Sequence, residues 1–267
     1  MSLFCCPVCG SPLAESPRAY HCPNGHDYDR AACGYVNLLQ SQASSRKRHG
    51  DDRRMLTARR DFLDGGFYAP IRDELAAAFA AASVSAAVDV GCGEGYYTAA
   101  LETACAGMAG LDVSTAALRF AARRLSRTAL CCASAFHLPF ADGSLDAVIS
   151  VFAPCAYAEF FRVLKPTGLL FKVSPLPDHL HELREVLYET PRPNKPEQRD
   201  EERFVSRKRS ELRFPVALPS QKAIADLFAM TPYCYKTPAD GEARLAALTS
   251  LTVTAAVAVE TFGKKEL

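Results

Sequence analysis

Residues 86–98, AAVDVGCGEGYYT, carry the strongest fold signal in this 267-residue chain. The first five residues are apolar apart from Asp89 and are typical of a short buried strand. Gly91, Gly93 and Gly95 follow at once, and a helical pattern comes after them. A strand, a glycine turn and a helix form the first unit of a Rossmann-like sheet. Because glycine has no Cβ, Gly91 and Gly93 would let the backbone approach a nucleoside cofactor closely.

The segments after this loop alternate between strand and helix. Residues 109–114 predict a second strand with Asp112 at its carboxyl end. Residues 117–125 predict a helix, and residues 145–150 predict a further strand. This alternation predicts an α/β fold with a doubly wound, mostly parallel sheet, in which Asp112 could accept hydrogen bonds from ribose hydroxyls. A dinucleotide-binding dehydrogenase is the alternative, but its loop has the spacing GxGxxG, whereas this one reads GxGxG.

A cluster of cysteines and histidines precedes this domain. Four of them have the spacing of zinc ligands: Cys6, Cys9, Cys22 and His26. Two such pairs on tight turns can surround one zinc ion tetrahedrally, and a complete set of four protein ligands predicts a structural site. Cys5 and His21 are alternative ligands, and a reduced cysteine cluster without metal is the other interpretation.

Composition excludes several other classes of protein. The chain has eleven cysteines, and this odd number argues against a disulfide framework. The N-terminus lacks signal-peptide character, which predicts a cytoplasmic protein. No apolar run reaches the roughly 18 residues of a membrane-spanning helix. The net charge is only +1, but residues 44–60 hold seven Lys/Arg against two Asp. That run could contact RNA phosphates, and the alternative is a solvated linker and helix face.

Several motifs together resemble those of class I S-adenosylmethionine-dependent methyltransferases. They are VDVGCGEG, GLDVS, LPFADGSLDAVIS and RVLKPTG. The chain is similar to the bacterial 23S rRNA (guanine-N1)-methyltransferase family. The similarity rests on the N-terminal cysteine cluster together with CGYVNLL (33–39), FAPC (152–155) and SPLPDHLHELREVLY (174–188). The resemblance covers about residues 4 to 240.

This resemblance implies methyl transfer from S-adenosylmethionine to N1 of a guanine in a hairpin loop of 23S rRNA, by a homodimer. It implies cofactor contacts from Tyr68, Gly93, Glu94 and His179. Without the resemblance, Tyr68 would be read as a core residue, His179 as a cap or surface residue, and Glu94 as a charge that stabilises a helix N-terminus. The candidate cofactor-binding set is thus Tyr68, Gly91, Gly93, Glu94, Asp112 and His179.

The predicted organisation has three parts. Residues 1–36 form a zinc-binding module for RNA recognition, residues 37–65 a basic linker and helix, and residues 66–267 the methyltransferase domain. Within residues 190–213 we expect an exposed loop, followed by a strand at RFPVAL (213–218). The base that removes the guanine N1 proton is not identifiable, although Asp142 is expected near the cleft. Candidate platforms for stacking the base are aromatic: Tyr96, Tyr97, Phe152 and Tyr157.

Two rival functions remain open from the sequence. One is a small-molecule methyltransferase of the same fold that acts on a quinone-type metabolite. It predicts activity without the N-terminal module. The other is a zinc-containing RNA-binding factor that holds the cofactor without catalysis. It predicts RNA binding without methyl transfer.

Overall fold

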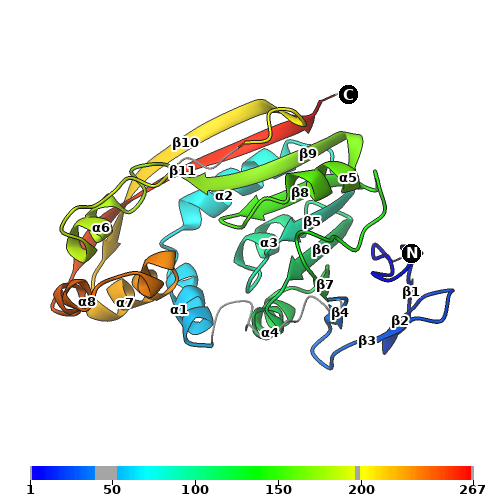
Figure 1. The fold of residues 1–267 in the computed structure, drawn as a ribbon, viewed down its shortest axis with the longest axis horizontal. Helices are drawn as coiled ribbons and strands as arrows, with labels where there is room; N and C mark the ends of the chain where they lie inside the picture. Colours follow the sequence, from blue (N-terminus) through cyan, green and yellow to red (C-terminus); the bar gives the residue numbers. More distant parts are fainter. Residues whose placement is uncertain (1, 40–52, 196–198, 266–267) are drawn as a thin grey trace.

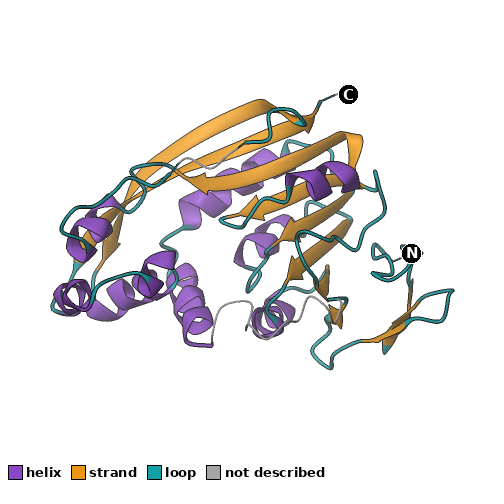
Figure 2. Cartoon of the chain, viewed as in Figure 1, coloured by secondary structure: helices purple, strands orange, loops and turns teal. Residues whose placement is uncertain are grey.

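The structure is a computed structural model that describes residues 2–39, 53–195 and 199–265 (Figure 1). Within these residues the main sheet has eight strands, drawn in orange in Figure 2. In sheet order they are β10 (Phe204–Leu218), β11 (Leu251–Lys264), β9 (Leu164–Pro175), β8 (Leu145–Val151), β5 (Ala86–Val90), β6 (Gly107–Asp112), β7 (Thr128–Cys132) and β4 (Val36–Asn37).

The predicted doubly wound, mostly parallel sheet is confirmed. Strands β9, β8, β5, β6, β7 and β4 pair in parallel, and β11 is antiparallel to both of its neighbours. The chain runs from β5 outward through β6 to β7, and then returns to the other side of β5 as β8 and β9. The strand order therefore reverses between β5 and β8. In open α/β sheets a ligand binds at the carboxyl ends of the strands beside such a switch point.

Helices cover both faces of the sheet (Figure 2). Helix α2 buries Ile71, Leu75 and Phe79 on one face, and the Phe79 ring lies 5.3 Å from that of Phe171 in β9. Helix α5 buries Phe160 on the opposite face of the sheet. The helices are α1 (Arg53–Asp64), α2 (Ala69–Ala80), α3 (Tyr96–Leu101), α4 (Thr115–Arg124), α5 (Tyr157–Val163), α6 (His181–Leu187), α7 (Gln221–Ala229) and α8 (Ala239–Ala246), with a 3-10 turn η2 (Pro232–Tyr235).

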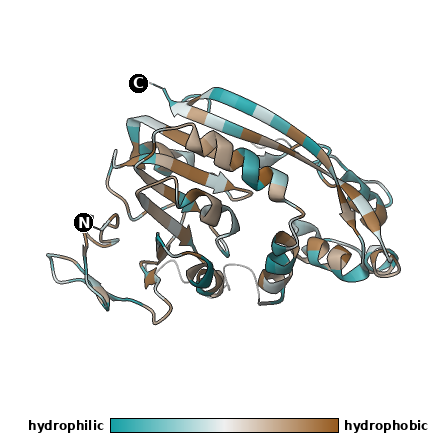
Figure 3. Cartoon of the chain, turned by 180° about the vertical axis from the view of Figure 1, so that it is seen from behind, coloured by the Kyte–Doolittle hydropathy of each residue, from teal (hydrophilic) through white to brown (hydrophobic). Residues whose placement is uncertain are grey.

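Side chains alternate between two cores along the central strands, which are largely hydrophobic in Figure 3. Ala87 and Ile149 face the core under α2, whereas Val88 and Val148 face the core under α5. A strand buried on both faces reads as a continuous apolar run, and this explains the signal at residues 86–90. None of the helices in the described parts of the chain is long and apolar enough to span a membrane.

The N-terminal module carries a small antiparallel sheet of β1 (Ala14–Glu15), β2 (Ala19–His21) and β3 (Asp27–Asp29). It packs directly on the main domain. The Phe4 ring lies 5.7 Å from the Phe140 ring, and the Cys5 N–H donates to the Pro139 carbonyl at 2.8 Å. The chain then joins the main sheet as β4, beside β7.

Only the first part of the segment 190–213 is a loop: its described residues before Phe204 form no helix or strand. From Phe204 onward it belongs to β10, the edge strand, which pairs with β11 along its whole length. Arg209 lies opposite Glu260 in register and forms an ion pair with it at 2.8 Å. The many charges that suggest a loop instead line the outer face and edge of this strand, where charged side chains protect against pairing with another chain. Leu212 and Phe214 pack against the core.

Candidate cofactor site and metal cluster

The glycine loop after β5 has three left-handed residues. Gly91, Gly93 and Gly95 have φ of 77°, 56° and 83°. A Cβ on Gly91 would lie 2.8 Å from the Cβ of Ala153, in the loop after β8. Glycine at this position therefore keeps the two loops on either side of the switch point in contact.

Asp112 lies at the carboxyl end of β6 and shapes the same loop. One carboxylate oxygen accepts from the Gly93 N–H at 2.9 Å, and the other accepts from the Ser114 N–H at 2.8 Å. The residue remains partly exposed. It is thus held at the edge where the sequence predicts a ribose ligand.

Asp89 is buried beneath the loop. The Thr98 hydroxyl donates to its carboxylate at 2.6 Å and so ties β5 to α3. Burial raises the pKa of Asp89 to about 6. This contact makes Asp89 an internal brace between the strand and the helix.

Glu94 is only 2% exposed. Its Oε2 forms an ion pair with Arg124 of α4 at 2.7 Å, and Arg124 also pairs with Asp64 of α1. Burial raises the pKa of Glu94, although the Arg124 guanidinium opposes this. Within the described residues, Oε1 of Glu94 is buried without a hydrogen-bond partner. A buried acceptor with no partner is costly, so this oxygen fits a ligand that brings a donor, such as the ammonium group of S-adenosylmethionine.

Tyr68 and His179 meet although 111 positions separate them in the sequence. The Tyr68 hydroxyl lies 3.3 Å from His179 Nε2, and both side chains are buried. The Ala256 N–H donates to His179 Nδ1 at 3.1 Å. Nδ1 is therefore the acceptor, and the proton of the neutral ring is on Nε2, directed at the tyrosine oxygen. Burial lowers the pKa of His179 to about 4, so the ring is neutral near pH 7 and only weakly basic.

The loop that carries His179 is held by residues that the sequence did not reveal. The Asn194 amide donates to the carbonyls of Leu176 and His179 at 3.2 and 3.1 Å. Its oxygen accepts from the Tyr233 hydroxyl at 3.0 Å. Asn194 and Arg124 stand in no motif, and their partners are distant in the chain, so no local signal marks them.

The cysteine and histidine pairs of the N-terminal module converge. Their ligand atoms all lie within 4.8 Å of one another, and the set is Cys6, Cys9, Cys22 and His26. Cys6 Sγ is 3.5 Å from His26 Nδ1, and the sulfurs of Cys9 and Cys22 are 3.4 Å apart. With Zn–S bonds of about 2.3 Å, the edge of a zinc tetrahedron is about 3.8 Å, so the donor set fits zinc.

Polar neighbours support the thiolate form of Cys9, whereas burial raises the pKa of the Cys22 thiol. Hydrogen bonds with the side chains of Asn24 and Ser11 lower the pKa of the Cys9 thiol to about 5. The Tyr28 hydroxyl lies 3.0 Å from Cys6 Sγ. Such outer partners orient the ligands of a metal site and tune their basicity.

The alternative ligands lie elsewhere. The Cys5 side chain is buried, burial raises its pKa, and its backbone pairs with the main domain. His21 is exposed and its Nδ1 lies 2.9 Å from Asp27. Neither belongs to the converging group of donors.

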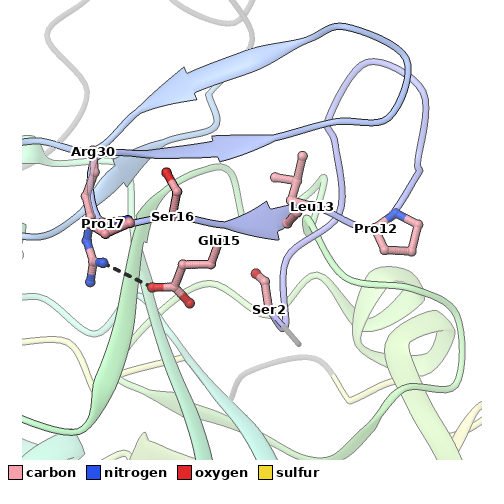
Figure 4. Close-up of a pocket in the computed structure, with 8 residues that line it drawn as sticks. Ser2, Pro12, Leu13, Glu15, Ser16, Pro17 and Arg30 are labelled. Atoms are coloured by element: carbon pink, nitrogen blue, oxygen red, sulfur yellow. Dashed lines mark hydrogen bonds and ion pairs between the residues drawn. The ribbon is translucent and has the colours of Figure 1, made fainter.

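A pocket of about 750 Å³ lies on this module (Figure 4). Its one cation, Arg30, is paired with Glu15 at 3.0 Å. The pocket is on the module, whereas the glycine loop opens at the carboxyl edge of the main sheet, so we do not assign the cofactor to it. The lining residues are Ser2, Pro12, Leu13, Ala14, Glu15, Ser16, Pro17 and Arg30.

Of two expectations about charged residues, the one for Asp142 needs correction, and the one for the basic run stays a prediction. Asp142 lies in the turn before β8, at the amino end of that strand, and is 80% exposed in an ion pair with Arg162. It therefore lies at the wrong end of the sheet for a base in the cleft. In the basic run, residues 44–52 lie outside the described residues. Arg59 faces Gly93, and Arg60 pairs with Asp61 at 2.8 Å. Contact of this run with RNA stays a prediction.

Comparisons with known proteins agree with this arrangement. The family model "Methyltransferase domain" matches residues 88–171, and the zinc-ribbon model "RlmA, N-terminal" matches residues 4–47. The chain is 38% identical to the "Putative 23S rRNA (guanine-N(1)-)-methyltransferase" of Micromonospora griseorubida over 94% of both chains.

The chain belongs to the 23S rRNA (guanine-N1)-methyltransferase family.

Another member of the family, the 23S rRNA (guanine(748)-N(1))-methyltransferase of Streptomyces fradiae, is 39% identical over 68% of this chain and 66% of its own length. Among solved structures, a methyltransferase-like protein of Bacillus halodurans matches with a TM-score of 0.50 and 13% identity, over 73% of this chain and 99% of its own. That likeness concerns the fold alone.

Proposed function

We propose that this protein transfers the methyl group of S-adenosylmethionine to N1 of a guanine in a hairpin loop of 23S rRNA. The observation that supports this most is the union, in one chain, of a zinc-ribbon cluster and a methyltransferase glycine loop. The chain is similar over 94% of its length to a relative that bears this activity in its name. A small-molecule methyltransferase would not need the N-terminal module.

The residues around the glycine loop have distinct tasks in this proposal. Asp112 would hydrogen-bond the ribose, and the free Oε1 of Glu94 would accept from the amino-acid part of the cofactor. Tyr68, whose oxygen accepts the proton of His179 Nε2, would be left with its own O–H to donate to the ligand. Bound S-adenosylmethionine supplies an electrophilic methyl group, so the protein's main contribution is alignment, worth about 7–11 kcal/mol in favourable cases.

In the N-terminal module, Cys6, Cys9, Cys22 and His26 would bind a structural zinc ion. The zinc would stabilise the β1–β3 sheet, and the surface of this module would bind the RNA hairpin. N1 is blocked in a Watson–Crick pair, so an unpaired loop guanine is the natural acceptor. The homodimer and the cytoplasmic location implied by the family resemblance stay predictions, and light scattering of the purified protein tests the first.

The test uses unmethylated 23S rRNA, labelled S-adenosylmethionine and the full-length protein. We expect label in one loop guanine, and a primer-extension stop at that nucleotide because an N1-methyl group blocks base pairing. Glu94→Gln and Asp112→Asn are matched variants that should lose activity together with affinity for S-adenosylhomocysteine. RNA binding without transfer would instead support the RNA-binding factor, and activity on small acceptors alone would support the metabolite enzyme.

A further inference from the structure

The acceptor base must approach from one side of the switch point. The glycine loop after β5 and Asp112 at the end of β6 would hold the cofactor. The strands on the other side of the reversal are β8 and β9. A base that meets the reactive methyl group without displacing the cofactor would therefore lie over the carboxyl ends of β8 and β9. This inference rests on the proposed function.

Next to the carboxyl ends of β8 and β9, the ring of Phe152 is exposed. Phe152 directly follows β8 and is 41% exposed, whereas most aromatic rings of the described chain are largely covered. Its backbone has φ of 52°, a left-handed conformation that is costly for a bulky residue. Strain of this kind persists where the surrounding structure imposes it, and it concentrates at ligand sites.

The loop that presents Phe152 is well braced. The Phe152 N–H donates to the Val173 carbonyl of β9 at 3.0 Å. The Ser150 hydroxyl donates to the Ala153 carbonyl at 3.3 Å, and the Ala153 Cβ abuts Gly91. Phe152 is thus a rigid ring beside the cofactor loop, and a preorganised ring loses little entropy when a ligand stacks on it.

The neighbours of Phe152 leave part of the ring free. Its centroid is 6.1 Å from that of Tyr68 and 5.9 Å from that of His179, both of which are buried. The other candidate platforms are engaged elsewhere. Tyr96 is buried and packs against Arg72 and Arg124, and Tyr157 lies between Phe160 and Phe204.

We propose that Phe152 is the platform on which the acceptor guanine stacks, and that the strained turn after β8 exists to hold this ring out of the core and beside the cofactor. Tyr96 and Tyr157, by contrast, have no part in stacking. Stacking on an aromatic ring tolerates any base, so Phe152 would set the position of the base and leave its identity to other contacts.

The experiment exploits the absence of tryptophan from the chain. Phe152→Trp places a single fluorophore at the platform, and Phe136→Trp places one on another exposed phenylalanine, 68% exposed in the loop after β7. A hairpin RNA with the 23S loop sequence is added in the presence of S-adenosylhomocysteine. We expect strong quenching by the stacked guanine at position 152 and little at position 136. Equal quenching at the two positions, or none at 152 when the RNA is bound, would overturn the proposal.

Kinetics supply the second measurement. Phe152→Leu keeps an apolar side chain but removes the π face, and it should lower kcat/KM for RNA by about 10- to 100-fold. Its affinity for S-adenosylhomocysteine should stay within about twofold of wild type, and Phe152→Trp should retain activity. The stacking proposal would be refuted if Phe152→Leu kept full activity, or if it lost affinity for S-adenosylhomocysteine to the same extent as activity. Either result would leave the proposed function standing. A wild-type protein that fails to methylate 23S rRNA would refute the proposed function instead.

Discussion

Two single residues show where this protein departs from relaxed geometry. Phe152 and Leu180 are the non-glycine residues with positive φ in the described part of the chain, at 52° and 55°. Both follow strands at the carboxyl edge of the sheet, and Leu180 is adjacent to His179. A left-handed conformation costs an L-residue about 1–2 kcal/mol. The strain therefore concentrates at the edge where we place the reacting groups.

A comparison of two variants measures the free-energy cost of the left-handed backbone at Phe152. Phe152→Gly and Phe152→Ala lose the same ring contacts, but only glycine adopts a left-handed conformation freely. We expect the glycine variant to have a free energy of unfolding about 1 kcal/mol higher than the alanine variant. Urea unfolding measures the difference. Equal stabilities would show that the turn after β8 is relaxed.

Asp89 makes stability depend on pH. Its pKa is about 6 in the folded protein and near 4 when unfolded, so the folded state binds the proton more tightly. Burying the ionised carboxylate lowers the free energy of unfolding; this loss grows as pH rises from about 4 to 6 and is constant above that. Asp89→Asn should thus be more stable than wild type at pH 8, by up to about 3 kcal/mol, and the advantage should vanish by about pH 4. Thermal unfolding across this range checks it, and an advantage that is unchanged at pH 4 would contradict it.

The element that matters most for the site is the loop between β9 and α6, which carries His179. Strand β11 holds it from one side, since Ala256 donates to His179 and Thr254 accepts from the Leu180 N–H. Residues 191–195 hold it from the other side through Asn194. A charged, irregular segment thereby stiffens a loop of the candidate cofactor site.

Removal of the Asn194 side chain should loosen this loop. Asn194→Ala leaves two carbonyls and the Tyr233 hydroxyl without their partner, at a cost of about 1–3 kcal/mol of stability. A smaller fraction of molecules would then hold His179 in place, so affinity for S-adenosylhomocysteine should fall by about fivefold or more. Calorimetry measures both quantities. Glu189→Ala, nearby in the chain and exposed, is the control and should change neither.

Helix α4 presents a basic face. Arg119 and Arg123 are exposed one turn apart, and the ring of Phe120 between them packs under Arg60 of α1. We expect the double variant Arg119→Glu/Arg123→Glu to weaken RNA binding and to reduce the slope of log K against log salt by about 2. Cofactor affinity should be unaffected. Filter binding at several salt concentrations tests this, and an unchanged slope would exclude this face from the RNA interface.

At the level of the whole molecule, the N-terminal module and the methyltransferase domain share structure. The module docks through Phe4 on Phe140 and through the Cys5–Pro139 hydrogen bond. Its last residues become strand β4 of the main sheet. Loss of the metal cluster would therefore destabilise the β4 edge of the main sheet as well as the module.

Chelation of zinc tests this coupling. Structural zinc contributes about 10–16 kcal/mol of apparent free energy in small modules, so its removal should unfold residues 2–35 and release the RNA. Amide exchange should rise at Val36 and Asn37, which pair with β7. Binding of S-adenosylhomocysteine should persist, because the glycine loop lies in the other domain. A chelated protein with unchanged exchange in the module would contradict the metal assignment.

The features that the sequence alone predicted correctly depend on residues close together in the chain. The strand, glycine turn and helix at 86–98 predicted the sheet, and the CxxC and CxxxH pairs predicted the metal cluster, because each depends on neighbours within a few positions. The strand expected at residues 213–218 begins earlier, at Phe204, because a charged edge strand and a loop can share the same composition. The contacts of Tyr68 with His179, of Glu94 with Arg124 and of Asn194 with the His179 loop became visible only once the chain was folded. These pairs join residues brought together by the packing of separate strands and helices, and no spacing along the chain encodes such a distance.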